Sequence, residues 1–109
     1  MTGRLLAASF SLLLASCHYG FFSNLVIKNG AATKVSGVVL IVKDKSYPVR
    51  DLEPGQSTIF HEHLPGEGAP VIAYTIQGRR LSGEGCYFTG GMPPRGEVIL
   101  TERGIVTRC

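Results

Sequence analysis

The sequence predicts an all-β protein, a single small antiparallel β-sandwich of about seven or eight strands. At 109 residues, the chain has room for one domain. It contains 14 glycines and only 17% charged residues, as suits a compact β protein. From Phe21 onward, short segments rich in Val, Ile, Thr, Tyr and Phe are separated by Gly, Pro and Asp every 8–12 residues or so, and no stretch keeps a helical period of about 3.6 residues.

The N-terminal segment, residues 1–16, differs from this pattern. Arg4 is followed by an apolar run of 11 residues from Leu5 to Ala15. A helix needs about 20 residues to cross a bilayer core, so the run is too short to span and is typical of a cleaved secretory signal. A buried N-terminal helix is the alternative, but only two serines interrupt the run.

The end of the run, Leu14-Ala15-Ser16-Cys17, resembles the lipobox of bacterial lipoproteins. The resemblance implies cleavage before Cys17, a diacylglycerol on its sulfur and usually a further acyl chain such as palmitate on the new N-terminus. Residues 17–24 would then form a lipidated tether, and two or three acyl chains hold a protein firmly on a bilayer. Ordinary cleavage near Ser9 or Ala15, which leaves Cys17 as a free thiol, is the alternative.

The residue after the cysteine is His18. An aspartate at this position resembles an inner-membrane retention signal, and its absence implies the outer membrane. We therefore expect a lipid-anchored protein of the cell envelope, in the outer membrane and facing the periplasm.

The predicted domain, residues 25–109, begins with a strand at 25–28 that ends in Asn29-Gly30, a strong turn signal. Residues 35–43 form the most apolar segment and are expected at the centre of a sheet. Residues 46–50 contain Pro48, which cannot donate to a β-ladder, so this strand is expected at an edge.

A turn at 51–56 follows, with Pro54 at its first central position and Gly55 supplying a positive φ. It leads into a strand at 57–63. The remaining predicted strands are residues 71–77, 80–82, 86–89, 97–101 and 105–107.

Two stretches, "VIKNGAATKVSGVVLIV" and "DLEPGQSTIF", together span residues 26–60. They are similar to bacterial Ig-like or fibronectin-III-like modules, in which an early strand ends in Asn-Gly and a Leu-x-Pro-Gly-x-Ser turn opens a later one. The chain has no tryptophan, so a true immunoglobulin pattern is not supported. The resemblance implies a scaffold that hosts many unrelated functions.

With Cys17 assigned to lipid, Cys86 and Cys109 remain. An even number of cysteines in an exported domain predicts a disulfide. Two independent thiols are the alternative. No CxxC pair or Cys/His cluster has the spacing of a metal site.

Two further features are candidates for binding. His61 and His63 would share one face of a strand, about 6–7 Å apart, and are weak metal candidates. A solvated strand face with Phe60 and Leu64 turned inward explains the same residues. The loop Met92-Pro93-Pro94-Arg95 offers residue types favoured at interfaces, although an ordinary hairpin loop stiffened by its prolines is the alternative.

The sequence contains no catalytic set. It lacks a GxSxG elbow, and its Gly-rich segments do not precede a helix that would cradle a phosphate. We expect neither enzymatic activity nor a cofactor. The net charge of +3 is small and scattered, which disfavours nucleic-acid binding.

The expected function is a structural or protein-interaction role with an envelope protein partner, on a membrane anchored through Cys17. One alternative is a periplasmic inhibitor of a cell-wall hydrolase. "SGEGCY" at residues 82–87 is similar to the Ser-Gly-x-x-Tyr loop of lysozyme inhibitors, but its tyrosine is one position late and a cysteine intervenes. The other alternative is weak metal or small-ligand binding through His61 and His63.

Overall fold

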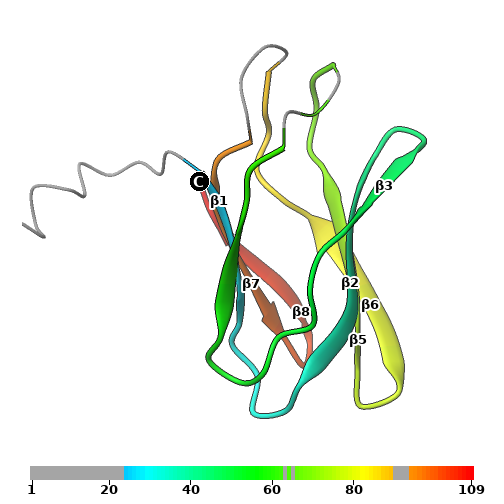
Figure 1. Cartoon of the computed structure of the whole chain (residues 1–109), viewed down its shortest axis with the longest axis vertical. Coiled ribbons are helices and arrows are strands. Elements are labelled where there is room, and N and C mark those ends of the chain that lie inside the picture. Colours follow the sequence, from blue (N-terminus) through cyan, green and yellow to red (C-terminus); the bar gives the residue numbers. More distant parts are fainter. Residues whose placement is uncertain (1–23, 63, 65, 90–93) are drawn as a thin grey trace, which may run out of the picture.

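The structure, a computed structural model, describes residues 24–62, 64, 66–89 and 94–109. Two four-stranded sheets face each other (Figure 1). Sheet A has the order β4-β1-β7-β8 and sheet B the order β3-β2-β5-β6. The strands are β1 (Leu25–Asn29), β2 (Val35–Val42), β3 (Lys45–Pro48), β4 (Ser57–Phe60), β5 (Val71–Ile76), β6 (Arg79–Glu84), β7 (Gly96–Thr101) and β8 (Gly104–Arg108). The predicted all-β sandwich is confirmed.

Most strand pairs are antiparallel, but β1 and β7 run parallel. Parallel neighbours cannot be joined by a tight turn and need a long crossover. Here all of sheet B and strand β4 lie between them in the sequence. As a result β1, the first strand, lies inside sheet A with β4 on one side and β7 on the other.

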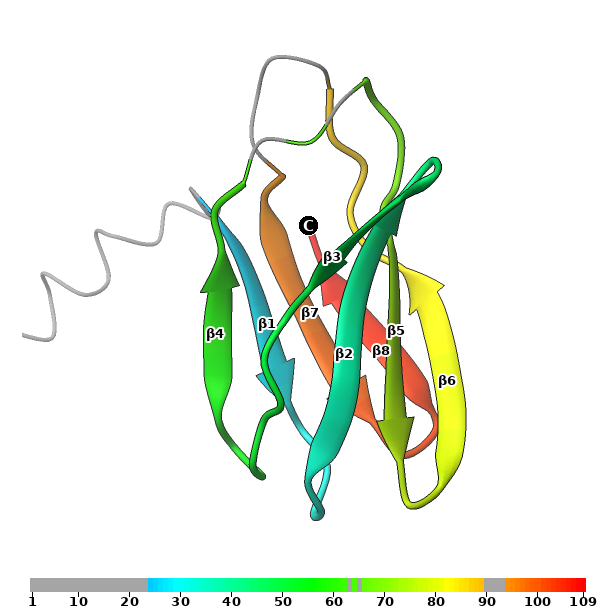
Figure 2. The same ribbon diagram turned by 45° about the vertical axis from the view of Figure 1, so that its right-hand side comes forward.

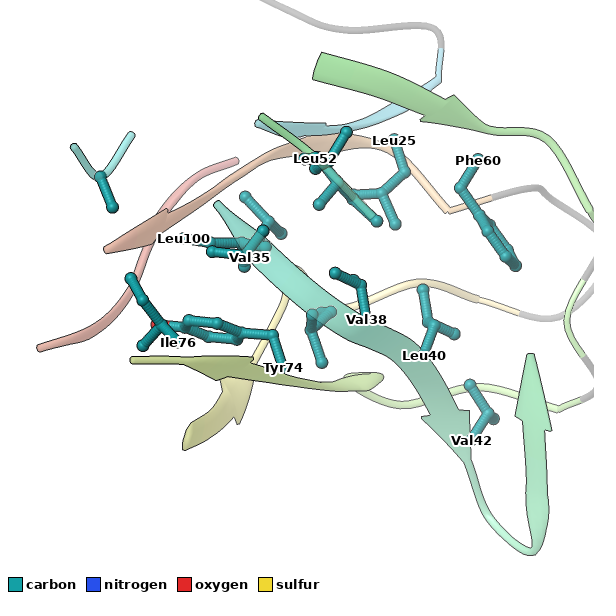
Figure 3. Packing of buried hydrophobic residues seen from close by; sticks show 14 of the residues in the cluster. Leu25, Val35, Val38, Leu40, Val42, Leu52, Phe60, Tyr74, Ile76 and Leu100 are labelled. Carbon is teal, nitrogen blue, oxygen red and sulfur yellow. The ribbon is translucent and has the colours of Figure 1, made fainter. Parts of the chain in front are cut away.

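The core fills the space between the sheets with side chains from both inner faces (Figure 3). Buried residues alternate along β1 and β7, as expected for strands with one covered face. In β2 the alternation breaks, because Val35 and Val38 are both buried. The pairing of β2 with β5 shifts between Ser36 and Val39, and Gly37 has a φ of 58°. A bulge at this glycine keeps both valines pointing inward.

Several local predictions are confirmed. Pro48 ends β3, which is an edge strand. The turn before β4 is closed by the Gln56 N–H, which donates to the carbonyl of Glu53 (2.9 Å), and Gly55 has a φ of 80°.

Most predicted strands differ from the observed ones by one or two residues at their ends, and two differ more. Residues 86–89 form no strand; Phe88 makes one isolated bridge with Gly68. Burial alternates along this segment, with Cys86 and Phe88 buried and the residues after each of them exposed. The segment nevertheless lies outside both sheets. The strand predicted at 57–63 ends at Phe60.

Asn29 is a polar residue without exposed surface at the end of β1. Its side-chain Nδ2 donates to the carbonyl oxygens of Thr33 (2.9 Å) and Leu52 (3.0 Å), and its Oδ1 accepts from the N–H of Ala31 (2.8 Å). The Leu52 carbonyl also accepts from the N–H of Val35 (3.0 Å). One side chain thus joins β1, the turn into sheet B and the segment that returns from sheet B to sheet A.

The backbone of Asn29 continues this connection. Its N–H donates to the carbonyl of Gln56 (2.9 Å), and its carbonyl accepts from the N–H of Gly55 (2.9 Å). Strand β4 starts directly after Gln56, with Ser57 opposite Lys28. Asn29 therefore sets the position at which β4 joins β1.

The Asn29-Gly30 turn joins the two sheets and is not a hairpin. A Cβ at Gly30 would lie 2.6 Å from Cγ2 of Ile99. Glycine is thus required here by the close approach of β7 rather than by a positive φ.

Tyr74 connects the two sheets near the same end of the core, because its partner Thr101 follows Leu100, which pairs with Asn29. Its ring is buried, and its hydroxyl donates to the carbonyl of Thr101 on β7 (2.6 Å). Burial raises the pKa of Tyr74 above its usual value of 10.0, because the buried site disfavours the phenolate.

We predict that Asn29→Ala lowers the free energy of unfolding by about 3 kcal/mol, roughly 1 kcal/mol for each side-chain hydrogen bond. Urea unfolding followed by circular dichroism measures this loss. The control is Lys28→Ala, because Lys28 is exposed on the same strand. Equal stability of the two variants would contradict the role assigned to Asn29.

We predict that Tyr74→Phe costs about 1 kcal/mol near pH 7, because the hydrogen bond to Thr101 is lost. In the unfolded chain the phenol ionises near its ordinary pKa, while the folded protein holds its proton to higher pH. The stability contributed by Tyr74 is therefore complete below pH 10 or so and is lost as pH rises toward the raised pKa. The wild-type advantage over Tyr74→Phe should shrink as the pH rises above about 10. A constant advantage would contradict the assignment, and Tyr87→Phe is the exposed control.

Candidate functional site: the groove beside strand β4

A groove of about 330 Å³ opens between the two sheets on one side of the sandwich. Its walls come from the chain that leaves β3, residues 48–50, and from β4 with the two residues after it, residues 58–62. We call this the β3–β4 groove. Strands β3 and β4 are edge strands of opposite sheets (Figure 2), so the groove lies where none of the described strands covers the side of the sandwich.

The opposite side of the sandwich is closed. There the edge strands β6 and β8 approach closely, and a Cβ at Gly83 would lie 2.6 Å from Cγ1 of Ile105. The disulfide between Cys86 and Cys109 joins the segments that follow these two strands. The predicted disulfide is confirmed, and it locks this side covalently.

An aromatic pair packs across the open side between β3 and β4. The rings of Tyr47 and Phe60 meet edge to face, with their centroids 5.9 Å apart. Phe60 is buried, whereas Ile59 next to it is 49% exposed on the outer face of sheet A. The groove therefore offers apolar surface beside an unpaired strand edge.

Two charged residues line the groove. Arg50 and Glu62 both line it, and both are exposed. Neither forms an ion pair with another of the residues that the structure describes. In general, an open strand edge supplies backbone donors and acceptors to an extended polypeptide, and a groove beside it takes alternate side chains.

Of the two histidines predicted as weak metal candidates, the structure describes only His61. His61 lines the groove and is exposed, but it follows β4 instead of lying within it. His63 lies outside the described residues. Within the described ranges, no three His, Cys, Asp or Glu side chains gather as metal ligands would.

The predicted binding loop is only partly described. Met92 and Pro93 lie outside the described residues, Pro94 is buried and Arg95 is exposed. A role of this loop in partner binding stays a prediction.

The "SGEGCY" segment has a different structure from the free loop to which it was compared. Ser82, Gly83 and Glu84 belong to β6 and pair with β5. Only after this strand does the chain present Tyr87, which is 63% exposed. The first half of the segment is therefore built into the closed side of the sandwich.

Close packing surrounds the disulfide. A Cβ at Gly96 would lie 2.6 Å from Sγ of Cys86, and this glycine has a φ of 113°. Its N–H donates to the carbonyl of Asn24 (3.2 Å). The start of β7, the residue before β1 and the disulfide thus share one end of the molecule.

The predicted lipidation site, Cys17, lies outside the described residues, and so does the predicted signal segment 1–16. In the described ranges, no helix is long and apolar enough to cross a membrane.

Sequence reasoning missed the groove residues Arg50, Ile59 and Glu62. A usable signal was present, because Pro48 indicated an edge strand and the first four residues of the predicted strand 57–63 contain neither charge nor proline. Nothing in the local pattern indicated that the two segments lie side by side.

Comparison with known proteins gives no match to this chain, whether with family models, with curated proteins or with solved structures.

We predict that Cys86→Ala combined with Cys109→Ala lowers the free energy of unfolding by about 3 kcal/mol in the chain-entropy description of the closed loop. Urea unfolding measures the change. Reduction of the wild type with dithiothreitol should reproduce the loss and should leave the double variant unchanged. An identical urea midpoint for all three samples would contradict the prediction.

Proposed function

We propose that the protein is a bacterial lipoprotein, anchored to the membrane through Cys17, whose β-sandwich serves in protein interaction within the cell envelope. The observation that carries the proposal is Leu14-Ala15-Ser16-Cys17, which ends an apolar run after a single positive charge. The proposed destination is the periplasmic face of the outer membrane. The proposed family is that of small Ig-like or fibronectin-III-like modules, and the two-sheet fold supports it.

The position of the domain along the chain agrees with a short tether. Strand β1 begins at Leu25, and the seven residue steps from Cys17 to Asn24 reach at most about 25 Å when fully extended. The domain would therefore stay close to the bilayer, where it meets membrane proteins and other lipoproteins.

The β3–β4 groove supports the interaction role. It combines a strand edge that none of the described residues pairs with, the exposed apolar side chain of Ile59 and two charged residues in its lining. Such a surface suits the recognition of a polypeptide chain.

We predict that cells expressing the full chain incorporate labelled palmitate into it and retain it in the membrane fraction. Cys17→Ala should abolish the label and release the protein, because the thiol that takes the lipid is gone. The matched control replaces Cys86 and Cys109 by alanine, which should leave the label in place. A soluble, unlabelled wild type, or label retained in Cys17→Ala, would overturn the proposed anchor.

A further inference from the structure

The sandwich has four edge strands, and three of them carry features that discourage pairing with another strand. Charge or proline on an edge is a common protection of this kind. The protecting residues are Lys45 and Pro48 in β3, Arg79, Arg80 and Glu84 in β6, and Arg108 in β8. Strand β4, with the sequence Ser57-Thr58-Ile59-Phe60, has neither charge nor proline.

Strand β4 also carries an exposed apolar side chain, Ile59, on the outer face of sheet A. Ile59 is 49% exposed, and it faces away from the core, next to the unpaired backbone edge. A strand added at this edge would cover Ile59 with its own outward side chains. Its inward side chains would enter the β3–β4 groove.

The charges at the groove run in a defined order along β4. Tyr47 and Phe60 lie at the same level. Strands β3 and β4 run in opposite directions (Figure 2). From the level of the aromatic pair, the chain after β3 passes Arg50 on its way to Leu52, which bridges Val35 at the start of β2. Glu62 instead follows the end of β4. The groove thus has its positive charge toward the start of β4 and its negative charge beyond the end of β4.

From this arrangement we propose that β4 pairs antiparallel with β4 of a second copy of the same chain. A two-fold axis inverts the direction of the strand, so the positive end of one groove meets the negative end of the other. Arg50 of each copy then faces Glu62 of the other, and the two Ile59 side chains cover each other. Sheet A continues through the axis as one sheet of two identical halves.

A second copy would pair with the strand edge, cover Ile59 and place an opposite charge against each charge of the groove. Two strands of four residues exchange about four backbone hydrogen bonds when paired antiparallel. The charge order of the groove is self-complementary under the two-fold axis. This inference concerns β4 and goes beyond the proposed anchor, and it does not depend on Cys17.

Site-specific photo-crosslinking in intact cells tests the pairing with the full chain. Benzoylphenylalanine is placed at position 59, and in a matched control at position 106. Val106 is also an exposed apolar residue (52%) and lies on β8, the opposite edge of the same sheet. Illumination should give an adduct of twice the chain mass from position 59 and none from position 106. Co-expression with an epitope-tagged copy should give the hybrid adduct.

A second test exchanges the charges at positions 50 and 62. Arg50→Glu or Glu62→Arg alone places like charges opposite each other at both ends and should lower the yield of adduct roughly tenfold. The two changes together restore opposite charges and should restore the yield. An adduct with a different protein, equal adducts from positions 59 and 106, or no recovery in the doubly changed chain would each overturn self-pairing. Palmitate labelling in the same cells reports the anchor independently, so the two proposals can fail separately.

Discussion

The structure depends on the hydrogen bonds of one buried amide, the side chain of Asn29. Two sheets that pack face to face need crossings in which the chain leaves one layer and later returns. Asn29 lies at the first crossing and binds the segment of the second through the Leu52 carbonyl. The backbone of the same residue bonds Gly55 and Gln56 just before β4 starts, so Asn29 also fixes where β4 meets β1.

The two lateral sides of the sandwich differ, because one is closely packed and the other contains the groove. On the side of β6 and β8, Ile105 packs against Gly83 and the disulfide joins the two segments beyond these strands. On the side of β3 and β4, the rings of Tyr47 and Phe60 are in contact, and the β3–β4 groove lies beside them. Burial and a covalent bond hold the closed side together, whereas the groove lies on the open side.

Local sequence signals were sufficient for much of the fold. Pro48 indicated an edge because it lacks a donor, and Pro54-Gly55 indicated the turn because only certain residues suit its backbone angles. The place of β1 between β4 and β7 was not predictable, since pairing between distant segments leaves no periodic trace. Asn29 looked like an ordinary turn residue because hydrogen bonding to remote carbonyls is invisible in sequence. The groove was missed for the same reason, since its walls belong to different sheets.

The central place of β1 in sheet A has a mechanical consequence. A tether attached before Asn24 would transmit any tension directly into β1. The strand is held by ladders on both flanks, to β4 over four residue pairs and to β7 over five. Tension along the strand axis would load these hydrogen bonds in shear, so they would have to break together rather than unzip one at a time. The arrangement suits a domain that must stay folded while it is pulled from its first strand, and β4, one ladder away, would share the force with whatever is bound to it.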